Sequence, residues 1–142
     1  MPPGSVHNKV TIAITPIVAA CTYGITGNDL YTVLVAGGTL LGLVLTPDLD
    51  VDNGSRSNYH IRKWFGNVVE FIWRAYWYPY AKLIPHRSAL SHFPVASTFL
   101  RVLYLLWPIL IINPTLITKN WFIVIIGLTI SDILHWIMDS IF

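Results

Sequence analysis

The sequence predicts an all-α membrane protein, a polytopic bundle of about four spanning helices with one amphipathic, aromatic-rich helix at the membrane interface. Two observations support this class. Hydrophobic residues make up 54% of the 142 residues and charged residues only 11%, about half the charged share of a soluble domain. The mean hydropathy is +0.59, and the apolar residues gather in long runs. The length predicts a single domain, residues 1–142.

The first two apolar runs are expected to form the first two spans. Val10–Thr26 carries no charge, and Pro16 is expected to kink it. Leu30–Thr46 is the second uncharged run, and a tight turn joins the two. Within the second run, Gly38 and Gly42 form a GxxxG pattern, which predicts close packing against another helix.

The pattern changes over Arg62–Tyr80, where an amphipathic helix is predicted. One polar stripe follows helical spacing, and the remaining positions are mostly aromatic or aliphatic. The stripe consists of Lys63, Asn67, Glu70 and Arg74. Such a helix is typical of the membrane interface, where it lies flat rather than crossing. A core helix beneath the bundle fits the same periodicity, so both interpretations stay open.

The last two apolar runs predict a hairpin of spanning helices. The first of them, Val95–Ile112, carries Arg101 near its start. The side chain of this arginine is expected to snorkel towards the headgroups. The second run begins at Trp121 and continues to the end of the chain.

Three polar residues interrupt this last run, namely Asp132, His135 and Asp139. Their spacing of i, i+3 and i+7 places them on one face of a helix. Ionisable groups inside a span are costly unless they are paired. Either each has a partner and the cluster only holds helices together, or the three bind a cation. The single cysteine, Cys21, excludes an internal disulfide and a CxxC site. A metal site would therefore use imidazole nitrogen and carboxylate oxygen.

The distribution of basic residues predicts how the spans are oriented. Seven of the nine lie in or just beyond the central loop: Arg56, Arg62, Lys63, Arg74, Lys82, Arg87 and Arg101. The positive-inside rule then places this loop and both termini in the cytoplasm. The same topology brings the remaining candidate ligands to that side: His7, Asp48, Asp50, His86, His92 and Asp139. Asp132 is expected about 10 Å deeper, at 1.5 Å of rise per residue. The net charge of +2 is too small to indicate a nucleic-acid partner.

Several of these side chains also have a simpler interpretation. Asp48 and Asp50 fit a solvated turn or a helix cap. His86 and His92 are six residues apart, so they do not share a helix face and meet only if the chain turns between them. Arg87 is suited to binding a phosphate or carboxylate, and equally to anchoring the chain at the headgroups.

The candidate residues together resemble a known family pattern. The motifs are His7, the Pro47-Asp48-Leu49-Asp50 run, His86-Arg87-Ser88 with Ser91-His92, and Asp132/His135/Asp139. They are similar to those of small bacterial membrane proteins described as metal-binding, in a wider group that contains the LexA-regulated, membrane-bound metal-dependent hydrolases. A more distant likeness is to zinc-dependent phospholipase C, whose HxxxD motif matches His135 and Asp139. The resemblance implies an α-helical protein of the bacterial inner membrane with a His/Asp metal site.

Two functions from different classes follow from these expectations. The first is a metal-dependent hydrolase of a phosphoester or lipid-like substrate at the cytoplasmic membrane face, in contact with membrane lipid. Zinc is the first expectation, with Mn, Fe or Mg also compatible, and eight candidate ligands predict a dinuclear centre. Asp50 or Asp139 would act as general base, and Arg87 would hold a substrate anion. The second is a non-catalytic metal-binding or metal-transport protein. No oligomeric state is predicted.

Overall fold

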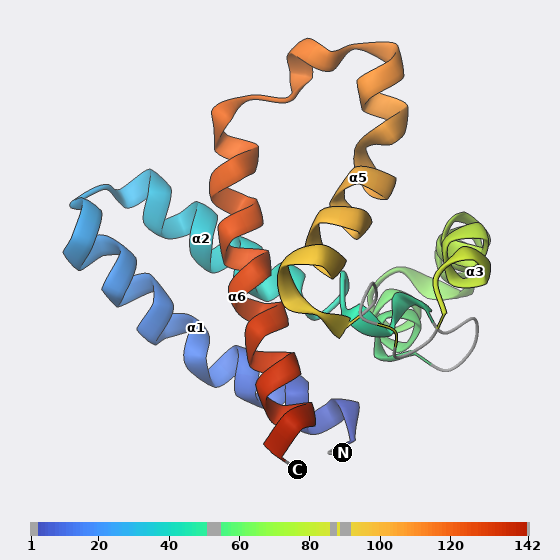
Figure 1. Ribbon diagram of the computed structural model, residues 1–142, viewed down its shortest axis with the longest axis horizontal. Coiled ribbons are helices and arrows are strands. Elements are labelled where there is room, and N and C mark those ends of the chain that lie inside the picture. The colour runs from blue at the N-terminus through green and yellow to red at the C-terminus, as the bar shows by residue number, and fades with distance from the viewer. Residues whose placement is uncertain (1–2, 51–54, 86–87, 89–91, 142) are drawn as a thin grey trace.

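The computed structural model describes residues 3–50, 55–85, 88 and 92–141, and every regular element in these ranges is a helix. The α-helices are α1 (Gly4–Thr26), α2 (Asp29–Leu41), α3 (Arg56–Leu83), α5 (Pro94–Ile112) and α6 (Lys119–Ile141). Two 3₁₀ turns, η1 (Pro47–Asp50) and η2 (Pro114–Leu116), lie between them. The predicted all-α class is confirmed (Figure 1).

Three of these helices, α1, α5 and α6, are long and apolar enough to cross a membrane. About four spans were expected, and the second run gives a shorter apolar helix than the others, because α2 has 13 residues and ends at Leu41. At 1.5 Å per residue it measures about 20 Å, shorter than a hydrocarbon core of about 30 Å. Beyond it the chain turns and enters η1 at Pro47. The backbone N–H groups of Gly42, Leu43 and Val44 donate to the carbonyls three residues earlier, so the chain tightens into turns after Leu41.

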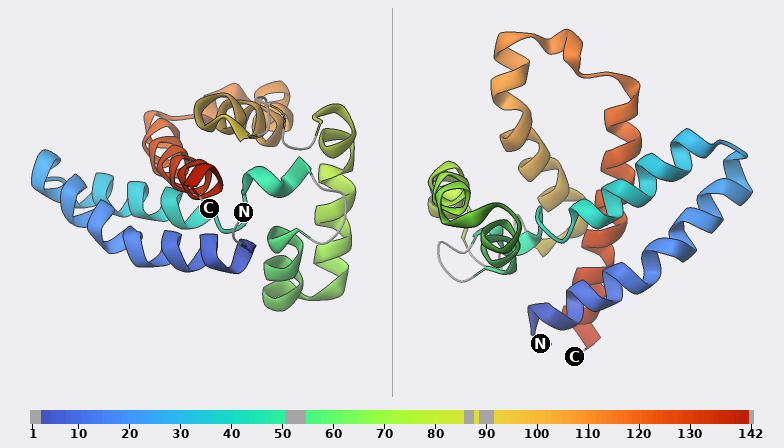
Figure 2. Two further views of the ribbon diagram at one scale, coloured as in Figure 1. Left: turned by 60° about the horizontal axis from the view of Figure 1, so that its bottom comes forward. Right: turned by 180° about the vertical axis from the view of Figure 1, so that it is seen from behind.

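The helices are arranged around α6. α1 and α2 form a hairpin on one side of it, α5 lies on the other, and α3 lies at the edge of the bundle (Figures 1 and 2). The two ends of the chain lie next to each other in every view. The start of α1 and the end of α6 therefore meet at one end of the bundle.

The closest helix contact is between α2 and α6, and glycines make it possible. A Cβ on Gly38 would overlap the carbonyl oxygen of Val124, and a Cβ on Gly127 would overlap that of Val35. A Cβ on Gly42 would overlap the side chain of Ser131. The packing role that the GxxxG pattern predicted for Gly38 and Gly42 is confirmed.

Replacing Gly38 by alanine is expected to separate α2 from α6 and to lower the stability of the bundle by about 1–3 kcal/mol, the usual range for overpacking. Gly37→Ala is the matched control, since a Cβ there meets nothing within 4 Å. This neighbouring substitution should be neutral or stabilise by up to about 1 kcal/mol through helix propensity. Thermal unfolding in detergent measures both. Equal midpoints for the two variants would contradict the contact.

α3 is not the single straight helix that the stripe predicted. It begins earlier, at Arg56, and is sharply bent at Gly66, whose φ of 87° and ψ of 176° are non-helical. Only glycine adopts this conformation without appreciable strain. Trp73 Nε1 donates to Ser57 Oγ at 3.0 Å, so the segments before and after the bend lie face to face. Local periodicity could not reveal this, because the helical spacing of polar residues continues on both sides of Gly66.

The second half of α3 attaches to the bundle through aromatic side chains. Trp77 and Tyr80 are buried in the core with Leu45, Leu49 and Leu128. The hydroxyls of Tyr76 and Tyr104 donate to each other's backbone carbonyls at 2.8 and 2.7 Å, which ties α3 to α5. On the outer side, large apolar side chains are exposed: Trp64, Phe65, Val68, Phe71 and Ile72. α3 therefore has one face in the core and one apolar face pointing away from it.

Candidate metal centre

Six of the predicted site residues converge at the end of the bundle where the termini meet. They come from four segments that are distant in sequence. His7 lies in α1, Asp48 and Asp50 lie in η1, His92 lies just before α5, and His135 and Asp139 lie in α6. The side chains form a chain of alternating imidazoles and carboxylates.

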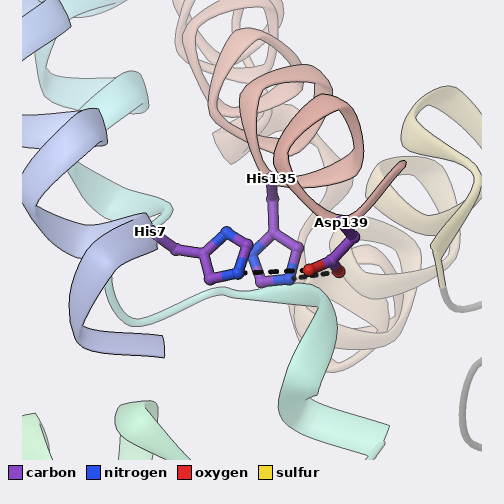
Figure 3. A group of neighbouring side chains, drawn as sticks. All are labelled: His7, His135 and Asp139. Atoms are coloured by element: carbon purple, nitrogen blue, oxygen red, sulfur yellow. Dashed lines mark ion pairs between the residues drawn. The ribbon is translucent and has the colours of Figure 1, made fainter. Parts of the chain in front are cut away.

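The first part of this chain is formed by His7, His135 and Asp139 (Figure 3). His7 Nε2 lies 3.2 Å from Asp139 Oδ1, and His135 Nε2 lies 3.2 Å from Asp139 Oδ2. The two imidazole rings stack with centroids 4.0 Å apart and an angle of 16° between their planes. Both Nε2 atoms therefore face the same carboxylate. The i, i+4 spacing within α6 places His135 and Asp139 in contact, and α1 brings His7 to them.

The second part joins His135 to η1 and to His92. Asp48 Oδ1 lies 3.9 Å from His135 Nε2 and 3.9 Å from His92 Nε2. On its other ring nitrogen, His92 Nδ1 lies 3.9 Å from Asp50 Oδ2. The metal-binding donors of Asp48, His92 and His135 lie within 4.8 Å of one another, as do those of His7, His135 and Asp139. His135 belongs to both groups.

The site is largely withdrawn from water and rich in negative charge. The side chains of the three histidines are 7–13% exposed, that of Asp50 is 0%, that of Asp139 is 11% and that of Asp48 is 28%. Three carboxylates placed among imidazoles in a dry site repel one another unless positive charge compensates them. A divalent cation or bound protons would supply that charge.

The donor set fits a divalent metal. Imidazole nitrogen and carboxylate oxygen together suit Zn, Mn and Fe. His7 Nδ1 is buried and has no hydrogen-bond partner among the residues described, so this ring lacks one of the partners that a buried imidazole normally has. A bound ion would convert the repulsive cluster of carboxylates into a set of ligands, which is the arrangement that the sequence predicted for this end of the protein.

Asp132 does not join these residues, and Arg101 is the reason. Asp132 is 1% exposed, and its Oδ2 accepts from Arg101 Nη2 and from Thr98 Oγ1. Arg101 is also 1% exposed, so the prediction that it snorkels is wrong. Its Nη1 donates to the Leu45 carbonyl at 2.6 Å. We assign Asp132 to this ion pair and not to the metal-binding groups. Through the Leu45 carbonyl, Arg101 also contacts the chain just before the turn that carries Asp48.

The sequence analysis expected Arg101 at the headgroups and missed its pairing with Asp132, although a signal was available. The two acids on the polar face of the last helix needed partners of opposite charge. Arg101 was the one arginine or lysine inside a predicted span. Asn8 was also missed, and its Nδ2 lies 2.6 Å from His60 Nε2. Two candidates, His86 and Arg87, lie outside the described residues.

Comparison with known proteins places the chain in a family. The sequence model of DUF2227, described as an uncharacterized metal-binding protein, matches residues 2–118. The matched range includes His7, Asp48, Asp50 and His92 and ends just before α6. No curated protein and no solved structure matches the chain, so the likeness to LexA-regulated hydrolases and to phospholipase C gains no support here. The chain belongs to the DUF2227 family of metal-binding proteins.

Proposed function

We propose that this metal-binding protein is a membrane-embedded, metal-dependent hydrolase acting on a phosphoester or lipid-like substrate. The observation that supports it is the buried chain of imidazoles and carboxylates at one end of an apolar bundle. The metal would be held by His7, His135, Asp139, Asp48 and His92. When bound, the metal would polarise the substrate as a Lewis acid and would lower the pKa of water towards neutral. Zinc suits this donor set best, and Mn, Fe and Mg are the alternatives to test.

The contacts favour one ion over the dinuclear centre that the number of candidate ligands suggested. The same atom, His135 Nε2, faces Asp139 at 3.2 Å and Asp48 at 3.9 Å. An imidazole nitrogen has one lone pair, so it ligates one ion at a time. We therefore propose a single ion at His135, with donors from either group completing its coordination.

The acids differ in exposure, which suggests different roles. Asp50 has a fully buried side chain and faces His92 Nδ1, while His92 Nε2 faces Asp48. A metal-binding histidine is commonly held in orientation by a carboxylate at its other ring nitrogen. We therefore propose that Asp50 orients His92 and does not act as a general base. Asp139 lies between two imidazoles and is proposed as a ligand. Asp48 is the most exposed of the three carboxylates and is the best placed to meet a reacting molecule.

We further propose that α1, α5 and α6 cross the bacterial inner membrane, that α2 and the turns after it carry the chain back from the far end of α1, and that the site lies on the cytoplasmic side. The apolar lengths of these helices and the basic residues of the central region support it. The exposed apolar face of α3 would then lie at the interface. Lys63→Cys in a Cys21→Ser background tests this, because Lys63 is exposed. Labelling by an impermeant reagent only from the cytoplasmic side is expected, and labelling from outside would refute the orientation.

The activity test uses purified protein that has been stripped with a chelator and reloaded separately with Zn, Mn, Fe(II) or Mg. Phosphomonoesters, phosphodiesters and phospholipids are the substrates. Metal-dependent turnover is expected for the wild type and for His60→Ala, and is expected to be absent in His135→Ala. Stoichiometric metal without turnover would refute the hydrolase and leave a metal-binding protein.

A non-catalytic metal-binding or transport role is the second candidate, and one observation favours it. Five protein side chains offer donors, His135 and four others around it, which is one more than a tetrahedral ion needs. If all coordination positions were filled by protein, no position would remain for a substrate. Exchange of the bound metal with ions in solution, without any turnover, would be the expected behaviour of such a protein.

A further inference from the structure

A second polar cavity lies between the two halves of α3, separate from the candidate metal centre. Its volume is about 380 Å³, and it is lined by Ser55, Arg56, Asn58, Tyr59, Arg62, Glu70 and Arg74. The bend at Gly66 creates it by folding the segment that starts at Arg56 against the segment that contains Glu70 and Arg74. A cavity of this size is within the range of small-molecule sites.

Positive charge dominates this cavity. Three guanidinium groups line it, against the single carboxylate of Glu70. Glu70 Oε1 lies 3.7 Å from Arg74 Nε, which is beyond hydrogen-bond distance, and this Nε is buried without a hydrogen-bond partner. Within the described part of the chain, neither Arg56 nor Arg62 forms an ion pair. Arg56 Cζ lies 5.6 Å from the centroid of the Tyr59 ring, and Arg62 is exposed. The cavity therefore has an excess of positive charge and one buried guanidinium donor, Arg74 Nε, without a hydrogen-bond partner.

The surroundings strengthen the positive field. His60, in the same helical segment, is partly buried. Its pKa is lowered first by burial and then by the charges of Arg56 and Lys63. A field that disfavours a further positive charge favours an anion. Guanidinium groups bind phosphate through paired, directional N–H donors, which makes phosphate the best-matched anion.

The position of the cavity relates it to both the membrane and the metal centre. Trp64 and Phe71, on the same two segments, are exposed apolar side chains of the kind that enters the headgroup region. The residues flanking His7 contact the first segment of α3. Asn8 contacts His60, and a Cβ on Gly4 would lie 2.7 Å from Arg56 Cγ. The cavity is therefore adjacent to the α1 turn that carries a candidate metal ligand.

We propose that the arginine cavity of α3 binds a phosphate group, carried by an anionic lipid headgroup or free in solution. Binding rests on the three arginines and does not need the metal. An anchored phosphate would hold the first segment of α3, and with it the start of α1, in a defined position beside the metal centre.

The test measures binding of inorganic phosphate to the full-length protein in a zwitterionic detergent by titration calorimetry. The variant Arg62→Gln/Arg74→Gln removes two guanidiniums, and Lys82→Gln/Lys119→Gln removes the same charge from exposed positions outside the cavity. We expect affinity to fall at least about tenfold in the first variant and to change little in the second. Equal affinity in the two variants would overturn the proposal.

A second arm distinguishes the source of the phosphate. In nanodiscs of phosphatidylcholine with one-fifth phosphatidylglycerol, native mass spectrometry counts the retained anionic lipids. Retention that is lost in Arg62→Gln/Arg74→Gln, without binding of inorganic phosphate, assigns the cavity to a lipid headgroup. Absence of an arginine-dependent signal in both arms overturns the proposal.

Two further variants keep the result interpretable if the double substitution impairs folding. Glu70→Gln removes the only acid among the lining residues and should strengthen phosphate binding, and weaker binding would count against the cavity. His135→Ala should bind phosphate like the wild type. If phosphate binding were lost together with the metal in this variant, the phosphate would belong to the metal centre and the separate site would be refuted.

Discussion

His135→Ala is expected to abolish stoichiometric metal binding and to lower the affinity for metal at least about a hundredfold. A loss of this size corresponds to the contribution of one ligand to a typical protein–metal binding free energy. His135 is the residue common to both ligand groups, and its Nε2 faces the carboxylates of Asp139 and Asp48. Among the residues that the structure describes, no group of three candidate ligands remains once His135 is removed. Elemental analysis of purified protein, followed by competition titration with a chelating dye, measures the loss.

The matched control for this prediction is His60→Ala, which removes a histidine that belongs to neither group and should keep wild-type metal content. Asp50→Asn should weaken binding by about 10–100-fold, the usual cost of losing a carboxylate that orients a ligating histidine. Metal at about a hundred times its dissociation constant should stabilise the wild type by about 2.7 kcal/mol, with no effect on His135→Ala. Wild-type metal content in His135→Ala would refute the site.

Arg101→Met is expected to destabilise the protein by about 3–5 kcal/mol, because it leaves Asp132 buried without its counter-charge. The guanidinium of Arg101, on α5, donates hydrogen bonds both to Asp132 on α6 and to the Leu45 carbonyl beyond α2. The substitution therefore loosens the contacts among these three segments. The turn that follows Leu45 carries Asp48, so metal affinity should fall as well. Thermal and denaturant unfolding in detergent measure the first effect, and metal titration the second.

The double variant Arg101→Met/Asp132→Leu separates charge from packing. Replacing both members of a buried ion pair by apolar residues is often neutral or stabilising, so the double variant should recover most of the stability lost in Arg101→Met. Metal affinity should stay reduced, because the bond to Leu45 is still missing. Lys82→Met controls for loss of a positive charge at an exposed position. A double variant as unstable as Arg101→Met would argue against an ion pair at this site.

The end of the bundle at which the candidate ligands gather could be predicted from the order of the apolar runs along the chain. A chain that leaves one side and returns brings His7 and the Asp48–Asp50 turn to the same end, whatever the details of packing. Four spans were not needed for this result. The chain also returns when the second run is the short helix α2 followed by a turn, and the imidazoles and carboxylates still meet at one end.

The sequence by itself determined the all-helical class, the apolar runs that form α1, α5 and α6, and the end of the molecule at which the polar side chains gather. These properties depend on local periodicity, apolar length and the order of polar residues along the chain. Only the tertiary structure decided that Asp132 pairs with Arg101, 31 residues away, and that α3 folds back at Gly66 to form an arginine cavity. The physical reason is that a helical pattern specifies which face a side chain occupies. It does not specify which distant residue will meet it there, and a single glycine with a positive φ redirects a helix without interrupting its hydrophobic pattern.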